Sequence, residues 1–75
     1  MKNKLSERQT EVYNFIYDYI NLKGYAPSIS DISKALYISK PVAKKYIDIL
    51  TEKGYIKHTP FIARSIVIIK QIQAS

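Results

Sequence analysis

The sequence predicts a mainly α-helical domain that ends in a small β-hairpin, and three observations point to this fold class. Three segments carry apolar residues at helical spacing, and each begins at a serine, which is a preferred helix cap. After Gly54 the pattern changes to runs rich in β-branched residues on both sides of Pro60. The chain has 75 residues, enough for one modest core. We therefore expect a single domain over residues 1–75, with its core within residues 5–70.

The first helix is expected to begin at Ser6 and to end at Gly24. The Ser6 hydroxyl is placed to accept a hydrogen bond from a first-turn amide, and Gln9 can reach back to the Ser6 amide. Gly24 can adopt the left-handed conformation that ends a helix, and Pro27 disfavours helical geometry at the residue before it. The apolar stripe of this helix comprises Val12, Phe15, Ile16, Tyr19 and Ile20.

The second helix is expected to be short, about two turns, and to begin at Ser28. Asp31 follows three residues later, so the capping-box pattern recurs with a carboxylate that also suits the positive end of the helix. Residues 37–39 then form a turn. The predicted buried stripe comprises Ile29, Ile32, Ala35 and Leu36.

The third helix is predicted over about residues 40–53, with Ser39 as its cap and Gly54 closing it. Pro41 fits near the start, because its missing amide would be unpaired there anyway. The inward stripe comprises Ala43, Ile47 and Leu50. Other faces of the helix carry Lys40, Val42, Lys44, Lys45 and Asp48.

Two strands, at residues 55–59 and 65–69, are expected to flank an exposed loop from Pro60 to Arg64. Three helices followed by a two-stranded antiparallel wing make a winged helix-turn-helix. The order of the predicted elements therefore gives the fold class.

The charge balance favours nucleic acid as the partner. Twelve Lys and Arg stand against six Asp and Glu, for a net charge of +6, which attracts polyanions. With no cysteine and one histidine, we expect no disulfide, metal centre or cofactor, and the small size disfavours an enzyme. No apolar run approaches the roughly 20 residues of a membrane span, and no signal peptide begins the chain, so we expect no membrane partner and a cytoplasmic location.

A helix with a cationic outer face suits the major groove of double-stranded DNA. Lysine can donate to guanine, and valine can contact a thymine methyl, so the base-reading candidates are Lys40, Val42, Lys44 and Lys45. The serines at helix starts can bind phosphate. Resemblance to winged helices implies that the wing, about residues 59–64, would lie along the backbone or in the minor groove. The backbone candidates are Ser28, Ser39, Tyr46, Lys57, Thr59 and Arg64, with Arg64 the strongest in the wing. We interpret His58 as an ordinary strand residue and assign it no chemistry beyond a phosphate contact.

The chain resembles the N-terminal DNA-binding domain of the LexA repressor family over nearly its whole length. The resemblance lies in LSERQTEV at residues 5–12, GYAPS at 24–28, the DIS..L pattern at 31–36 and KGYIKHTPFIARSIVII at 53–69. It implies a winged helix-turn-helix that binds DNA in a bacterial or phage regulator.

The chain also departs from that family. LexA repressors carry a second, self-cleaving peptidase domain to which nothing here corresponds, so the resemblance implies no self-cleavage. Tyr37 stands where helix-turn-helix proteins usually have glycine, in a turn one residue shorter than in LexA, and a positive φ there would cost about 1 kcal/mol. Lys44 and Lys45 occupy positions where some members have acidic residues, which implies a different operator.

The leading interpretation is a sequence-specific transcriptional regulator, a repressor that occupies a promoter. The alternative is a winged-helix protein-interaction module, such as a phage-type adaptor or inhibitor, and single-strand or RNA binding ranks third. Two copies could pair through the apolar strand around Ile66 to Ile72, or the protein could bind as a monomer. A complete small regulator and one domain of a longer repressor both fit the sequence.

Overall fold

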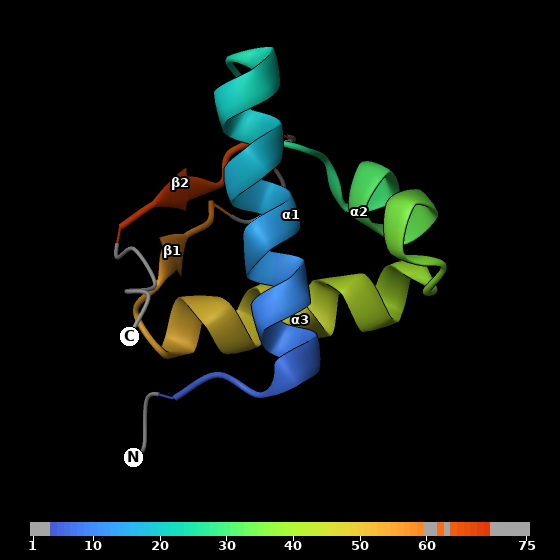
Figure 1. The fold of residues 1–75 in the computed structure, drawn as a ribbon, viewed down its shortest axis with the longest axis vertical. Helices are drawn as coiled ribbons and strands as arrows, with labels where there is room; N and C mark the ends of the chain where they lie inside the picture. Colours follow the sequence, from blue (N-terminus) through green and yellow to red (C-terminus); the bar gives the residue numbers. More distant parts are fainter. Residues whose placement is uncertain (1–3, 60–61, 63, 70–75) are drawn as a thin grey trace.

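The computed structural model describes residues 4–59, 62 and 64–69 and contains three helices and a two-stranded sheet (Figure 1). The elements are α1 (Glu7–Lys23), α2 (Ile29–Leu36), α3 (Lys40–Glu52), β1 (Ile56–Lys57) and β2 (Val67–Ile68). The strands are antiparallel, with Ile56 opposite Ile68 and Lys57 opposite Val67. This architecture confirms the predicted winged helix-turn-helix.

The strands are shorter than predicted, because only two residue pairs form the ladder instead of the five-residue strands expected at 55–59 and 65–69. Beyond the ladder, the Thr59 amide donates to the Ser65 hydroxyl at 3.1 Å and that hydroxyl donates to the Thr59 carbonyl at 3.0 Å. Side-chain hydrogen bonds therefore replace ladder bonds at the base of the wing. Pro60, Phe61 and Ala63 of the predicted loop, and residues 70–72 of the proposed pairing strand, lie outside the described residues.

Each helix begins at the serine predicted to cap it. Ser6 accepts from the Gln9 amide at 3.2 Å while the Gln9 side chain accepts from the Ser6 amide at 2.9 Å. Ser28 and Asp31 form the same reciprocal pair at 3.1 and 3.0 Å. Ser39 accepts from a first-turn amide of α3 at 3.3 Å. The local capping signals in the sequence therefore set the three helix starts.

The helix ends use left-handed backbone. Gly24 caps α1 with φ of 82°, as predicted, and Gly54 follows α3 with φ of 85°. Tyr37 caps α2 with φ of 57° and ψ of 44°, a conformation that L residues with a Cβ rarely adopt. The turn between α2 and α3 therefore carries the strain that a glycine there would avoid.

The core lies where the three helices and the hairpin meet, and the inward stripe predicted for α3 is fully buried. On α2 only Ile32 is buried, and Ala35 is exposed, so its prediction as a core residue was wrong. The eight-residue helix packs through the face shared by Ile29, Ile32 and Leu36, and Ala35 projects beyond the edge of that face. Among the described residues, the buried core cluster comprises Val12, Tyr13, Ile16, Ala26, Ile32, Ala43, Ile47, Leu50, Tyr55, Ile56 and Ile66.

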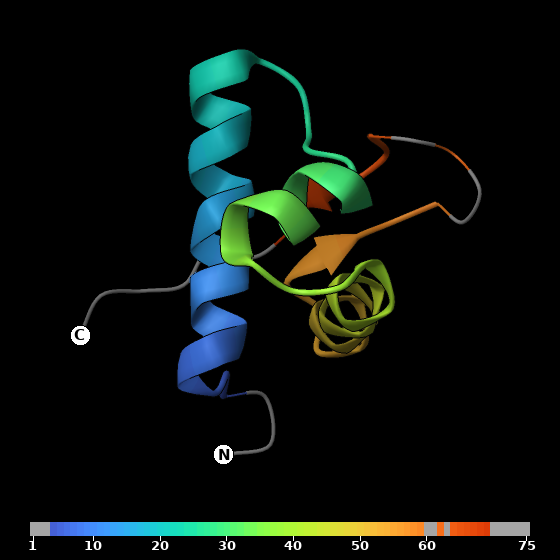
Figure 2. The ribbon, with the colours of Figure 1, turned by 90° about the vertical axis from the view of Figure 1, so that its right-hand side faces the viewer.

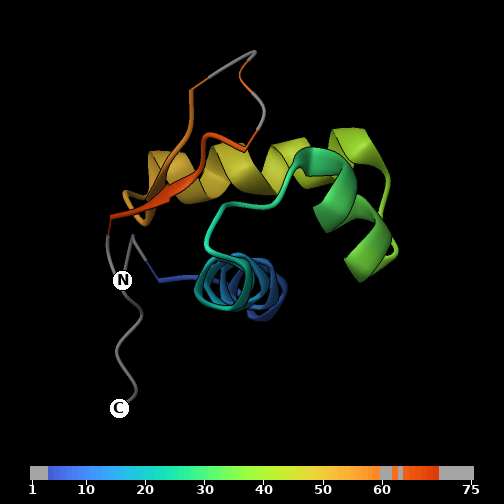
Figure 3. The same ribbon diagram turned by 90° about the horizontal axis from the view of Figure 1, so that it is seen from above.

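The arrangement leaves α3 and the wing on one side of the molecule. Figures 2 and 3 show that the chain leaving β1 projects on the side that lies away from α1, next to α3. Within the described residues, no helix is both long and apolar enough to cross a bilayer.

Candidate nucleic-acid interface

The four base-reading candidates all lie on the exposed part of α3. Burial of Ala43, Ile47 and Leu50 fixes the rotation of the helix, so the remaining faces point away from the core. The exposed candidates are Lys40, Val42, Lys44 and Lys45.

A groove of about 700 Å³ lies beside α3 and brings several of the predicted residues together. Its walls come from the start of α2, the first half of α3 and the wing. Four predicted contact residues line it: Ser28, Lys40, Lys44 and Arg64. His58, which we interpreted as an ordinary strand residue, lines it too, whereas Val42 and Lys45 are not among the lining residues. The α3 candidates therefore divide between the groove and the outer surface of the helix.

Charge is distributed unevenly along α3. The first half carries three lysines, and the second half carries Asp48 and Glu52, which are both exposed. Lys44 and Asp48 form an ion pair at 3.2 Å, with 58% and 59% of their side chains exposed. Such an exposed pair adds little stability. Its main effect is to place a carboxylate next to one of the proposed DNA-reading lysines.

The hydroxyls of Ser28 and Ser39, at the starts of α2 and α3, can each donate a hydrogen bond to a ligand. Both hydroxyls act as acceptors for helix amides, so each retains its own proton to donate. The start of α2 already holds a carboxylate, because Asp31 accepts from the Ser28 amide. That backbone hydrogen bond is the largest cause of the lowered pKa of Asp31. Burial opposes the lowering of this pKa, and Arg64 and Tyr19 contribute to it.

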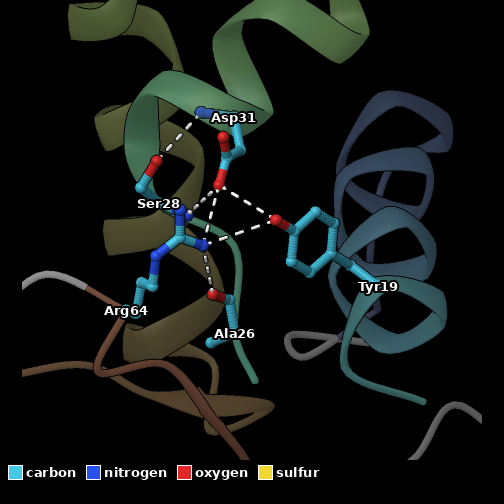
Figure 4. Close-up of polar contacts among 5 residues, drawn as sticks. All are labelled: Tyr19, Ala26, Ser28, Asp31 and Arg64. Atoms are coloured by element: carbon cyan, nitrogen blue, oxygen red, sulfur yellow. Dashed lines mark hydrogen bonds and ion pairs between the residues drawn. The ribbon is translucent and has the colours of Figure 1, made fainter. Parts of the chain in front are cut away.

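Arg64 does not extend freely from the wing (Figure 4). Its Nη1 donates to the Asp31 carboxylate at 3.0 Å and to the Ala26 carbonyl at 3.1 Å, with the Tyr19 hydroxyl at 3.4 Å. Its guanidinium carbon lies 5.0 Å from the centre of the Tyr25 ring. The strongest wing candidate is thus attached to α1, the α1–α2 connector and α2.

The other backbone candidates have different surroundings. Lys57, Thr59 and Ser39 are exposed, as a phosphate contact requires. Tyr46 is half-buried and packs against the core, and its hydroxyl contributes to the raised pKa of Arg8, after the larger effect of Glu11. Part of its ring is therefore occupied by packing within the domain.

Sequence reasoning missed the role of Arg8. Its guanidinium pairs with Glu11 at 2.6 Å and donates to the carbonyl of Leu36 at 3.0 Å, which joins α1 to the end of α2. The i,i+3 spacing of Arg8 and Glu11 signals their pair, but no local pattern signals a contact 28 residues away. No group of three metal-ligating side chains occurs in the part of the chain that the structure describes.

Comparisons with known proteins identify a matching family and similar sequences. Residues 2–65 match the model of the LexA DNA binding domain family. The chain is 41% identical to a LexA repressor of Thermosipho melanesiensis over 68 residues, which is 91% of this chain and 34% of that protein. It is 37% identical to a Staphylococcus aureus LexA repressor over 67 residues, 88% of this chain and 32% of the relative. It is 36% identical to a Pseudothermotoga lettingae LexA repressor over 74 residues, which is 99% of this chain and 36% of that protein. The chain spans about a third of the length of these curated relatives.

Proposed function

The chain belongs to the LexA DNA-binding domain family, and we propose on that basis that it binds double-stranded DNA sequence-specifically and represses transcription. One observation carries the proposal beyond family membership. The exposed faces of α3 present Lys40 and Lys44 in the groove beside the wing and Lys45 on the outer surface of the helix, and no described segment covers them. A cationic helix next to a hairpin is a suitable shape for the major groove and its flanking backbone.

In this proposal the first half of α3 enters the major groove. Lys40, Lys44 and Lys45 donate to base edges, and Val42 contacts a thymine methyl. Asp48 and Glu52 favour this orientation, because their carboxylates repel phosphates near the second half of the helix. The helix therefore approaches DNA with its N-terminal end foremost.

Contacts to the DNA backbone set the register. The hydroxyls of Ser28 and Ser39 donate to phosphates at the starts of α2 and α3. Lys57, Thr59 and Arg64 approach the backbone from the wing, about residues 59–64. We leave Tyr46 out of the contact set, because its ring packs against the core. Occupation of a promoter then excludes polymerase without any small-molecule cofactor.

The alternative, a protein-interaction module, has one observation in its favour. The groove beside α3 includes the apolar side chains of Ile29, Ile62 and Ile66, which would suit a peptide better than a phosphate. The cationic residues on the same walls favour DNA, since a polyanion would neutralise their charges.

Binding to random-sequence duplex DNA separates the two functions. We expect fluorescence anisotropy to show binding at low salt that weakens as salt rises, with a slope equivalent to several phosphates. Absence of binding at low salt would remove the DNA-binding proposal. Selection of bound duplexes from a random pool then gives the preferred site. A two-fold symmetric motif would indicate that two copies bind, with the exposed Val67 and Ile69 as candidate pairing residues, and an asymmetric motif would indicate a monomer.

A further inference from the structure

Among the described wing residues, Arg64 is the one whose side chain forms hydrogen bonds with the helices and their connector. Its Nη1 reaches Asp31 on α2, Ala26 in the connector and Tyr19 on α1, at 3.0, 3.1 and 3.4 Å (Figure 4). The Asp31 oxygen that accepts this bond also accepts from the Tyr19 hydroxyl at 3.2 Å and from the Ser28 amide at 3.0 Å. One carboxylate oxygen thus connects the wing, α1 and the start of α2.

The wing needs such an anchor. Among the described residues its ladder has only two residue pairs, and isolated two-stranded hairpins are marginal in water. Arg64 itself has φ of 58°, a left-handed conformation that persists in L residues only where the surroundings hold it. The backbone turn and the side-chain contacts therefore act together to direct the guanidinium toward Asp31.

The anchor uses only one edge of the guanidinium. All three hydrogen bonds come from Nη1, and Nε and Nη2 have no partner among the described residues. The Arg64 side chain is 42% exposed, and it lines the groove beside α3 together with Lys40 and Lys44. Arg64 can therefore keep its contact with Asp31 and present two N–H groups to a phosphate at the same time.

We propose that Arg64 is a positioning residue whose pair with Asp31 holds the wing at a fixed place against the start of α2, and that duplex DNA binds to the wing in this position. The inference rests on the proposed DNA-binding function and deepens it. A simple charge effect makes the opposite prediction, because Asp31 is a negative charge next to the groove and its removal should strengthen binding to a polyanion.

Asp31→Asn distinguishes the two effects. We expect it to weaken binding to the selected duplex about fivefold, because the wing must then be ordered on binding. Asp18→Asn is the matched control, since it removes the same charge from an exposed position on α1. We expect that variant to leave affinity unchanged or slightly stronger. Equal or tighter binding by Asp31→Asn would overturn the proposal.

A double-mutant cycle with Arg64→Gln separates the anchor from helix capping, because Asp31 also caps α2. In the Arg64→Gln background, Asp31→Asn should cause no further loss, since the pair is already broken. An equal loss in both backgrounds would assign the effect to the cap and would contradict the proposal.

Amide relaxation of the free protein gives a readout that does not depend on DNA. We expect faster motion at Thr59 and Ser65 in Asp31→Asn, with α1 and α3 unchanged, and unaltered motion in the wing would overturn the anchor. If the unmodified protein binds no duplex, the proposed function fails, and this inference with it. If it binds duplex and Asp31→Asn binds equally well, only this inference fails.

Discussion

The ammonium of Lys44 lies 3.2 Å from the carboxylate of Asp48, one turn further along α3. The pair joins the basic first half of the helix to its acidic second half. In the proposed complex, Lys44 must exchange this carboxylate for DNA. The pair therefore opposes the binding of Lys44 to any phosphate. A base edge with a matching acceptor compensates best for the loss of the pair.

Asp48→Asn should strengthen binding to random-sequence duplex about threefold, because Lys44 then no longer has a competing carboxylate. Binding to the selected site should change less, so that discrimination falls. Anisotropy titrations on both duplexes measure the two affinities. The free energy of unfolding should change by less than about 0.5 kcal/mol, since the pair is exposed. Equal effects of Asp48→Asn and of Asp18→Asn on α1 would show that the position of Asp48 on α3 is irrelevant.

Tyr37→Gly should stabilise the fold by about 0.5–1 kcal/mol, because glycine adopts the left-handed region without a Cβ clash. The tyrosine ring is 95% exposed and loses no packing in the exchange. Urea denaturation measures the difference. Tyr37→Ala is the control, since alanine keeps the Cβ and should give no gain. A loss of stability in the glycine variant would mean that the strain at this turn is absent.

The capping signals show how far local sequence determines this fold. Ser6 with Gln9, and Ser28 with Asp31, were predicted as reciprocal pairs, and the structure confirms both. These interactions span three residues, so the sequence spacing alone specifies them. The same holds for Gly24, where the end of an apolar stripe coincides with a residue that tolerates positive φ.

Contacts between distant segments could not be predicted in this way. Arg64 and Asp31 are 33 residues apart, and the prediction that Arg64 contacts the DNA backbone named no partner for it within the protein. Ala35 sits at helical spacing from Ile32, but an eight-residue helix buries too narrow a face to include it. Tyr46 adjoins the lysines in sequence, yet it lies beside the buried stripe of α3. In each case, packing against another element decides the outcome.

The pKa of Asp31 gives a prediction for acid stability. Hydrogen bonding by the Ser28 amide, with support from Arg64 and Tyr19, lowers this pKa in the folded state. A carboxyl with a lowered folded-state pKa stabilises the protein above its unfolded-state pKa, and this contribution is lost as pH falls through the folded-state value. As the pH falls from about 5 through the folded-state pKa of Asp31, the unmodified protein should therefore lose more stability than Asp31→Asn. Urea denaturation at several pH values tests this, and parallel pH profiles for the two proteins would contradict it.

The most direct test of DNA binding through α3 is the affinity of the Lys44→Glu, Lys45→Glu variant for the selected duplex. Both side chains are exposed, so circular dichroism and thermal unfolding should match those of the unmodified protein. We predict that binding falls by at least about 100-fold, because two attractive charges become repulsive. Near-normal affinity in a correctly folded variant would show that this face of α3 does not contact DNA.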